Sequence, residues 1–235
     1  MDRGIWVTWY DLPEDGRESY VSWLHRSYIP ELLKRPGFLW GAHYAEVEKA
    51  TRAATRRTDD PAVPTGSHFM LLFGAETADV FGDPVPSAIN AGLPEADRKM
   101  LALRIGERVS IMAEFGRVDG PEANTYRDGM MLANCIQFGT YNTPWQNEEE
   151  LLAYYKQGRL PHMAVMPGCV RTRKLVAVAG WAKHGVLYEF TSLEARHKNF
   201  IGHGDAKMKA WSDRMIPRLT HAPGSANLAL RIWPL

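Results

Sequence analysis

The chain has 235 residues, and its 28 Lys and Arg side chains nearly balance its 27 Asp and Glu side chains. Hydrophobic residues make up 45% and charged residues 23% of the sequence, which is ordinary for a folded protein and excludes a disordered chain. The net charge of +1 gives no reason to expect a nucleic acid or an acidic membrane as partner.

The N-terminal stretch and the cysteines bear on location. MDRGIWVTWY lacks a basic region followed by a long apolar stretch, so we expect no signal peptide. No apolar run approaches the roughly 20 residues of a membrane span. Cys135 and Cys169 form no C-x-x-C motif, so we expect neither a disulfide framework nor a metal site. A cytoplasmic, reduced location is therefore expected.

In the first half, the expected elements follow the order β-α-β-β-α-β. Residues 4 to 12 alternate and are rich in β-branched and aromatic types, which predicts a strand. Residues 14 to 35 carry apolar residues at helical spacing, and Pro36-Gly37 ends that helix. The further expected elements are a strand over 38 to 48, a loop over 49 to 66, a strand over 68 to 74, a helical region over 93 to 106, a strand over 108 to 115 and a linker over 116 to 129.

The second half repeats this order. The expected elements are a strand over 135 to 141, a helix over 147 to 166 with Asn147 as N-cap, strands over 170 to 179 and 186 to 191, a helical region over 193 to 219 and a last strand over 226 to 233. The class is therefore α+β, with ferredoxin-like β-α-β-β-α-β repeats at about 1–120 and 130–235.

A shift of 131 residues supports this repetition. Over residues 5 to 37 it gives seven identities without a gap, where composition alone would give roughly two. The matched pairs are Ile5 and Ile136, Tyr10 and Tyr141, Pro13 and Pro144, Glu18 and Glu149, Pro30 and Pro161, Pro36 and Pro167, and Gly37 and Gly168. The alternative is a chance match, because Pro and Gly recur wherever helices and strands end.

The stretch SWLHRSYIPELLKRPGFLWGAHY resembles the dimeric α+β barrel superfamily, and most closely its EthD-like members. There the first helix carries an aromatic-rich W-Y-x-x-E-H-x-P pattern and ends at Pro-Gly. The residues that match are Trp23, Pro30, Pro36 and Gly37 in the first copy, and Tyr154, Pro161, Pro167 and Gly168 in the second. Tyr28 and Arg159 stand where the family usually has His.

The resemblance implies an architecture and a range of activities. Two four-stranded antiparallel sheets would face each other as a barrel with helices outside, and this chain would supply both sheets as a pseudo-dimer. Small molecules in this superfamily usually sit between a sheet and its own helices. Members include cofactor-free monooxygenases acting on polyketides, polyketide cyclases, muconolactone isomerases and haem enzymes such as chlorite dismutases, so the fold alone does not decide the chemistry.

Histidine and tyrosine side chains of the first half are the expected acid–base residues. His25 and Tyr28 share a helix face by i, i+3 spacing, His43 lies on the second strand, and Tyr10 lies on the first strand with Trp6 and Thr8. We therefore predict His25, Tyr28, His43 and Tyr10 as catalytic residues. The alternative for each is a structural role in the core, hydrogen-bonded to backbone.

Substrate-binding residues are predicted from the aromatic surplus and from one strand arginine. Trp6, Trp9 and Trp40 would form flat walls for a planar ligand, and Arg231 would bind a substrate oxygen. The alternatives are that the tryptophans fill the barrel core and that the arginine is exposed or paired with a carboxylate.

The second half carries a competing set of polar residues. Arg171 and Arg173 share a strand face, Glu189 lies on a strand, and His197 and His203 lie six residues apart in the last helical region. His184, in the sequence GWAKHGV, and His221, before APG, are expected in surface loops. If the first-half histidines proved uninvolved, His197, His203 and Arg231 would be the next candidates.

Three functions follow as hypotheses. The first is a small-molecule enzyme of isomerase, cyclase, lyase or cofactor-free monooxygenase type, which acts on an aromatic, polyketide-like or lactone substrate by His and Tyr acid–base chemistry without metal or cofactor. The second is a haem enzyme of chlorite-dismutase-like architecture, with His197 or His203 as axial ligand. The third is a non-catalytic small-ligand-binding or stress-associated protein. A small-molecule substrate is the expected partner, and a homodimer is compatible with each hypothesis.

Overall fold

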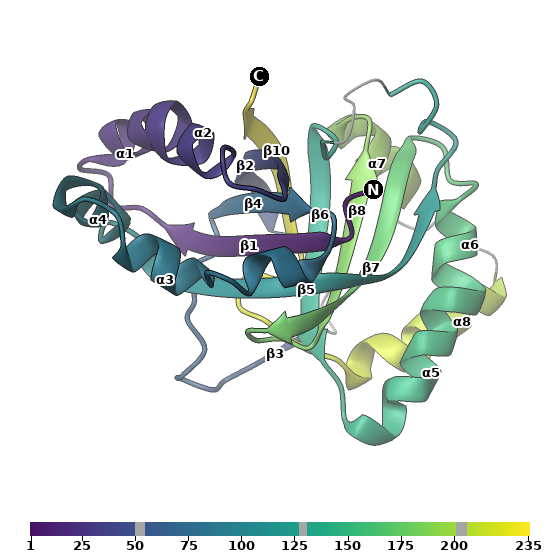
Figure 1. Cartoon of the computed structure of the whole chain (residues 1–235). Coiled ribbons are helices and arrows are strands. Elements are labelled where there is room, and N and C mark those ends of the chain that lie inside the picture. The colour runs from purple at the N-terminus through teal and green to yellow at the C-terminus, as the bar shows by residue number, and fades with distance from the viewer. Residues whose placement is uncertain (50–54, 127–130, 201–205) are drawn as a thin grey trace.

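The computed structural model describes residues 1–49, 55–126, 131–200 and 206–235, and it shows a mixed α+β fold around a closed β-barrel (Figure 1). Eight strands form the barrel, each antiparallel to its neighbours: β1 (Gly4–Asp11), β2 (Phe38–Lys49), β4 (Phe69–Ala75), β5 (Ile105–Asp119), β6 (Cys135–Asn142), β7 (Cys169–Ala179), β8 (His184–Phe190) and β10 (Asn227–Trp233). The strand order is β10-β2-β4-β1-β5-β7-β8-β6, and β10 also pairs with β6, which closes the barrel.

Each half of the chain contributes four neighbouring strands in the same order. The first half runs β2-β4-β1-β5 and the second runs β7-β8-β6-β10. The halves join where β5 pairs with β7 and where β10 pairs with β2. Outside the barrel, β3 (Arg56–Arg57) and β9 (Thr220–His221) form one short parallel pair.

The strand registers of the two halves also correspond. In the first half Tyr10 lies opposite Phe69, and His43 lies opposite Leu71. In the second half Tyr141 lies opposite His184, and Lys174 lies opposite Val186. A shift of 131 residues on the first two strands and of 115 on the third relates each pair to its counterpart. Tyr141 and Lys174 therefore take the places of Tyr10 and His43.

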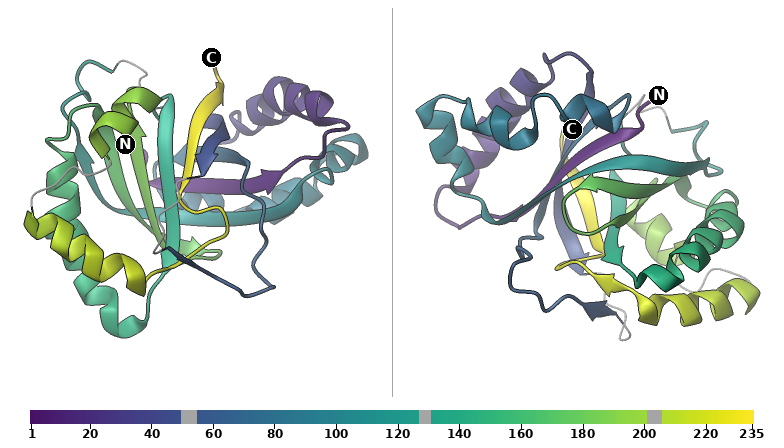
Figure 2. Two further views of the ribbon diagram at one scale, coloured as in Figure 1. Left: turned by 180° about the vertical axis from the view of Figure 1, so that it is seen from behind. Right: turned by 60° about the horizontal axis from the view of Figure 1, so that its bottom comes forward.

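The helices lie outside the barrel, against the outer face of their own half (Figure 2). Those of the first half are α1 (Arg17–Trp23), α2 (Ile29–Leu32), α3 (Pro86–Ala91) and α4 (Glu95–Leu101), and those of the second half are α5 (Glu148–Ala153), α6 (Leu160–Met163), α7 (Leu193–Phe200) and α8 (Ala206–Met215). Short 3-10 turns cover Ala78–Phe81, Trp145–Asn147 and Ile216–Arg218.

The first helix of each half is widened at the same place. A π-helical segment, Leu24–Tyr28, joins α1 to α2, and another, Tyr154–Arg159, joins α5 to α6. Each helix leads into a strand through a Pro-Gly pair, and Gly37 and Gly168 have φ of 86° and 81°. A side chain there would be strained, because only glycine adopts this left-handed conformation readily.

Three clusters of apolar side chains form the core. One fills the barrel interior and includes Ile5, Val7 and Trp9. The other two lie between each sheet and its helices, and Trp6 and Tyr10 belong to the one in the first half. The predicted alternation of the first strand is therefore confirmed, because successive residues of β1 point to opposite faces of a sheet that is buried on both sides.

Several boundaries differ from the expected ones. The helical region over 93 to 106 corresponds to α4 alone, with α3 before it, and β5 continues through Asp119 into the expected linker. The expected loop over 49 to 66 contains the short β3, and its residues 50–54, like residues 127–130 of the linker, lie outside the described residues. Asn147 is the N-cap of α5, but its side chain makes no capping hydrogen bond.

One buried ion network ties the N-terminus into the barrel. Arg173 pairs with Asp2 at 2.7 Å and with Glu189 at 3.1 Å, and all three side chains are almost fully buried. Arg117 reaches the same Asp2 carboxylate at 3.0 Å. Burial acts against the ionised carboxylate, but Arg173 and Arg117 hold the pKa of Asp2 below its usual value. None of the helices in the described residues is long and apolar enough to cross a membrane.

Candidate functional site

Three of the four predicted catalytic residues form a hydrogen-bonded chain in the first half. The hydroxyl of Tyr10 on β1 lies 2.8 Å from Nε2 of His43 on β2, and Nδ1 of His43 lies 2.8 Å from Nε2 of His25 in the π-helical segment. Tyr10 and His43 are fully buried, and His25 is half-buried. Burial lowers the pKa of His25 to about 4, and burial and His25 together lower the pKa of His43 well below its usual value. Both imidazoles are therefore neutral at pH 7.

The fourth residue, Tyr28, does not join this chain. Its hydroxyl donates a hydrogen bond to Oδ1 of Asn90 at 2.7 Å. The α-helical i, i+3 spacing predicted that Tyr28 and His25 would converge. The segment is instead π-helical, so residues three apart are turned further from one another, and the two side chains reach different partners.

Arg104 occupies the space between the first-half sheet and helices. Its guanidinium carbon lies 4.8 Å from the ring centre of Tyr10, 5.6 Å from that of Tyr28 and 5.8 Å from that of Tyr20. The Nε atom donates to the hydroxyl of Tyr20 at 2.7 Å, and the guanidinium also pairs with Glu107. The place where a ligand was predicted is thus filled by an arginine of the chain itself.

The predicted substrate-binding tryptophans divide between two core clusters, with Trp6 in one and Trp9 and Trp40 in the other. Trp6 packs in the first-half helix cluster, whereas Trp9 faces the barrel interior beneath the guanidinium of Arg108, 4.1 Å from its ring centre. Trp40 donates to the buried Asp2 carboxylate at 2.8 Å. Arg231 donates to the carbonyl oxygen of Leu132 at 2.8 Å.

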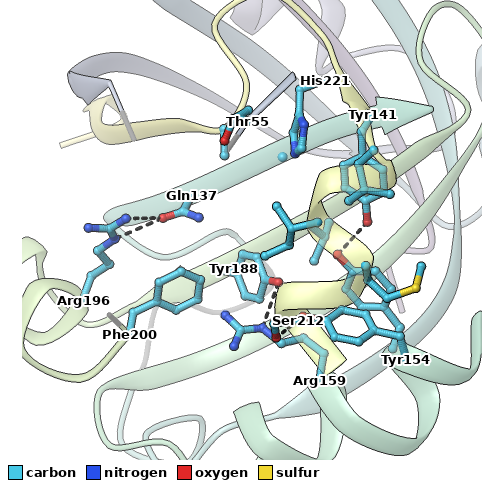
Figure 3. A pocket seen from close by; sticks show the side chains of 17 residues that line it. Thr55, Gln137, Tyr141, Tyr154, Arg159, Tyr188, Arg196, Phe200, Ser212 and His221 are labelled. Carbon is cyan, nitrogen blue, oxygen red and sulfur yellow. Dashed lines mark hydrogen bonds between the residues drawn. The ribbon is translucent and has the colours of Figure 1, made fainter. Parts of the chain in front are cut away.

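A cavity of about 250 Å³ lies between the second-half sheet and its helices (Figure 3). Aromatic rings dominate its wall, together with two arginines and one histidine. The lining residues that carry rings or polar groups are Thr55, Gln137, Tyr141, Tyr154, Tyr155, Arg159, Tyr188, Arg196, Phe200, Ser212 and His221.

One end of the cavity holds a pair of phenols beside a histidine. The hydroxyl of Tyr141 donates to that of Tyr155 at 2.6 Å, and burial raises the pKa of both tyrosines well above the usual value. The imidazole of His221 on β9 lies 5.5 Å from the ring of Tyr141, centre to centre. These tyrosines stay protonated at neutral pH, so they are donors rather than bases.

The other end holds Arg159, the last residue of the π-helical segment. Its Nε donates to the hydroxyl of Tyr188 at 3.1 Å, and its guanidinium carbon lies 4.5 Å from the ring centre of Phe200. Arg196 of α7 also lines the cavity and donates twice to Oε1 of Gln137, at 2.7 and 3.0 Å. Figure 3 shows Arg159 beside Tyr188, and His221 and Tyr141 toward the opposite end.

Lys174 lies beneath the phenol pair, in the place that His43 takes in the first half. Its ammonium nitrogen is 5.3 Å from the ring centre of Tyr155 and donates to the carbonyl oxygens of Leu175 and Gly185. It also lies 3.3 Å from Nδ1 of His184. Burial lowers the pKa of Lys174 to about 7.

Two histidines of the second half, His184 and His221, are not in the surface loops where the sequence placed them. His184 was expected in a surface loop, but it begins β8 and is almost fully buried, because its ring stacks on Tyr141. His221 is also not a loop residue, since it belongs to β9 and lines the cavity. His197 is exposed on α7, and His203 lies outside the described residues.

Sequence reasoning missed Arg159, His221 and the tyrosine pair as site residues. Arg159 was noticed only as the substitute for a family histidine. The signal that could have found His221 is its position just before the last strand of its half, since Arg104 precedes the last strand of the first half. Among the described residues, no group of three or more His, Cys, Asp or Glu could hold a metal ion.

Comparison with known proteins gives the fold but no close relative. No protein-family model and no curated protein matches the sequence. An anthrone oxidase-like protein superposes with a TM-score of 0.64 at 11% identity, over 98% of this chain and 91% of that chain. The chain has the fold of the dimeric α+β barrel proteins.

Two further solved structures share this barrel. A presumed monooxygenase from Lactobacillus acidophilus NCFM has a TM-score of 0.55 at 8% identity, over 99% of this chain and 94% of that one. A chlorite dismutase from Candidatus Nitrospira defluvii has a TM-score of 0.51 at 10% identity, over 97% and 90%. At these identities the dimeric α+β barrel fold is shared, and the chemistry must be argued from the cavity.

Proposed function

We propose that this dimeric α+β barrel consists of two ferredoxin-like repeats, residues 1–120 and 130–235, and that the second repeat carries the active site of a small-molecule enzyme. The observation that carries the proposal is the contrast between the halves. Arg104 fills the space over Tyr10, whereas a cavity of about 250 Å³ remains over Tyr141. Matching strand order and register support the repeats, and enclosed aromatic cavities with a few polar groups are the usual form of small-molecule sites.

The proposed chemistry begins with proton removal by His221. The imidazole takes a proton from a carbon next to a substrate carbonyl group, and the carbon's electron pair moves to the carbonyl oxygen as an enolate. Tyr141 lies next to this histidine and donates its proton to Tyr155 in a hydrogen bond, so the hydroxyl proton of Tyr155 is suited to stabilise that oxygen. A planar aromatic or polyketide-like substrate suits the rings of Tyr154, Tyr188 and Phe200.

The enolate can then follow one of several routes. Reprotonation at another carbon is isomerisation, attack on an internal electrophile is cyclisation, loss of a leaving group is a lyase reaction, and capture of O2 is oxidation. The likeness in fold to an anthrone oxidase-like protein and to a presumed monooxygenase favours oxidation as the route to test first.

Anthrone is a suitable probe because its methylene protons are acidic and its enolate reacts with O2 to give anthraquinone and water. Under air, wild-type protein should raise O2 uptake above the rate without protein. Under argon in deuterium oxide it should exchange the methylene protons faster than buffer does. His221→Ala should lower both rates on the order of 100-fold with little change in Tm. Equal rates with and without protein would contradict the proposal.

A haem enzyme is the first alternative, and the residues of the cavity do not fit a haem. The cavity of about 250 Å³ is smaller than the roughly 300–1,000 Å³ of sites for drug-sized ligands, and a haem is larger than such ligands. Its one lining histidine, His221, packs against Tyr141, with 5.5 Å between the ring centres. A Soret band in the purified protein would support the haem enzyme instead.

A non-catalytic binding protein is the second alternative. It would gain thermal stability with a bound ligand but would accelerate neither O2 uptake nor proton exchange. The two measurements with anthrone therefore separate it from the proposed enzyme.

A further inference from the structure

Arg159 is a buried cation with hydrogen-bond donors that have no acceptor among the described residues. The residue is 7% exposed, and its Nε donates to the hydroxyl of Tyr188. Across the part of the chain that the structure describes, no carboxylate pairs with Arg159, and its two terminal amino groups have no hydrogen-bond acceptor. A buried charge without a partner is costly, so such a group is expected to meet an anion.

The charged residues around the cavity also favour an anionic ligand. The lining includes Arg159, Arg196 and His221, and none of the described lining residues is Asp or Glu. By contrast, Arg104 in the first half pairs with the carboxylate of Glu107. Among the described residues, the second-half cavity therefore has no carboxylate that corresponds to Glu107 of the first half.

The orientation of the Arg159 guanidinium suits a planar anion. The bond from Nε to Tyr188 and the stacking on Phe200 hold the guanidinium plane, and the two terminal amino groups remain as a fork. A planar fork of N–H groups binds a carboxylate with two parallel hydrogen bonds. We infer that the cavity takes a hydroxy-substituted aromatic carboxylate, with the carboxylate on Arg159 and the ring between Tyr154, Tyr188 and Phe200.

This inference names the ligand class of the proposed active site and rests on that site being the cavity. The hydroxyl or carbonyl oxygen of the ligand would lie toward Tyr141, whose hydroxyl donates to Tyr155, at the end opposite Arg159. The carboxylate thus anchors the molecule, and the reacting oxygen faces the phenols and His221.

Isothermal titration calorimetry with a matched pair of probes tests the inference. The probes are 6-hydroxy-2-naphthoate, whose hydroxyl lies at the end opposite its carboxylate, and its neutral amide, 6-hydroxy-2-naphthamide, titrated into wild-type protein at pH 7. The acid should bind at least about 10-fold more tightly than the amide, because hydrogen bonds to a charged partner are the stronger ones. Arg159→Gln should abolish this preference and leave the affinity for the amide nearly unchanged.

A conservative variant and a control variant complete the test. Arg159→Lys retains the charge without the fork and should keep part of the preference even if Arg159→Gln folds poorly. Arg171→Gln is the matched control, since Arg171 lies in the same half, pairs with Asp119 and does not line the cavity. It should bind both probes as the wild type does. Equal affinities of wild type for acid and amide, no binding of either probe, or retention of the preference in Arg159→Gln would overturn the inference.

Competition with anthrone separates this inference from the proposed enzyme. If the acid binds through Arg159 but anthrone is neither oxidised nor exchanged, the ligand class stands and the proposed chemistry fails. If anthrone is turned over and the acid neither binds nor competes, the enzyme stands and the ligand class is wrong.

Discussion

Arg159 takes the position in the second half that Tyr28 takes in the first. The two residues are 131 apart, and each is the last residue of a π-helical segment that precedes a proline-containing turn. Tyr28 donates to Asn90 and packs against Arg104, so it helps to close its half. Arg159 donates to Tyr188 and lines a cavity. The half with tyrosine at this position has its space between sheet and helices filled, and the half with arginine there has a cavity.

Arg104 should contribute strongly to stability, because it joins the first-half helices to the sheet. Arg104→Ala leaves the hydroxyl of Tyr20 without its donor and opens space beside three tyrosine rings. The variant should lose about 2–4 kcal/mol of unfolding free energy in urea denaturation. Arg171→Ala, which removes a partly exposed pair with Asp119, should lose less than about 1 kcal/mol. Similar losses of unfolding free energy in both variants would show that Arg104 contributes no more to stability than a partly exposed arginine.

The buried ion network around Arg173 should also contribute strongly to stability, so the loss of one of its members should lower Tm. Arg173→Met leaves the carboxylates of Asp2 and Glu189 buried without this cation. Removal of one member of a buried ion pair costs about 3–5 kcal/mol. We therefore expect a large fall in Tm, measured by circular dichroism, and a smaller one in Arg171→Met. A Tm within a few degrees of the wild type would indicate that water or Arg117 compensates for the missing charge.

Lys174 should make stability depend on pH above neutrality. Its pKa is lowered from 10.5 to about 7 in the folded chain by burial, so between pH 7 and 10.5 the unfolded chain binds more protons. Unfolding free energy should therefore rise with pH across this window, by at most about 1.4 kcal/mol per pH unit, and this contribution is lost as the pH falls toward 7.

Lys174→Met should remove this contribution to the rise of unfolding free energy with pH. Lys156→Met is the control, because Lys156 is exposed on the first helix of the same half. Urea denaturation at a series of pH values from 7 to 9.5 measures both variants against the wild type. Equal slopes in wild type and Lys174→Met would mean that the buried amine keeps its ordinary pKa.

The sequence carried enough information for the barrel because strand alternation and Pro-Gly pairs are local signals. Trp6 and Tyr10 face the helices and Trp9 faces the barrel interior, as the period of two predicted. Gly37 and Gly168 both adopt the left-handed backbone that ends a helix and leads into a strand.

The candidate site depended on contacts that no local pattern records. Tyr10 and His43 lie on β1 and β2 of one sheet and His25 lies on the helix that covers it, and the three side chains form one hydrogen-bonded chain. Whether that place is open depends on Arg104, more than 90 residues along the chain from Tyr10, and sequence spacing does not predict such a contact. The π-helical segments are a second reason, since i, i+3 reasoning assumes an α-helix throughout.

The first-half chain stays a prediction as a catalytic site, and it can be tested separately. If the chemistry lies in the second half, His25→Ala and His43→Ala should each change anthrone turnover by less than about threefold. A true general base there would cost on the order of 100-fold in turnover with little change in Tm.

The claim that the second-half cavity carries the chemistry is tested most directly by comparing one variant from each half in the same assay. Val186→Phe places a larger ring in the wall of the second-half cavity, and His43→Ala removes the centre of the first-half chain. Both proteins should first be shown to be folded by circular dichroism. If the second-half cavity is the active site, kcat/KM for anthrone falls at least about 10-fold in Val186→Phe and stays near the wild-type value in His43→Ala. The opposite result, with activity lost in His43→Ala and kept in Val186→Phe, would place the chemistry in the first half and contradict the account.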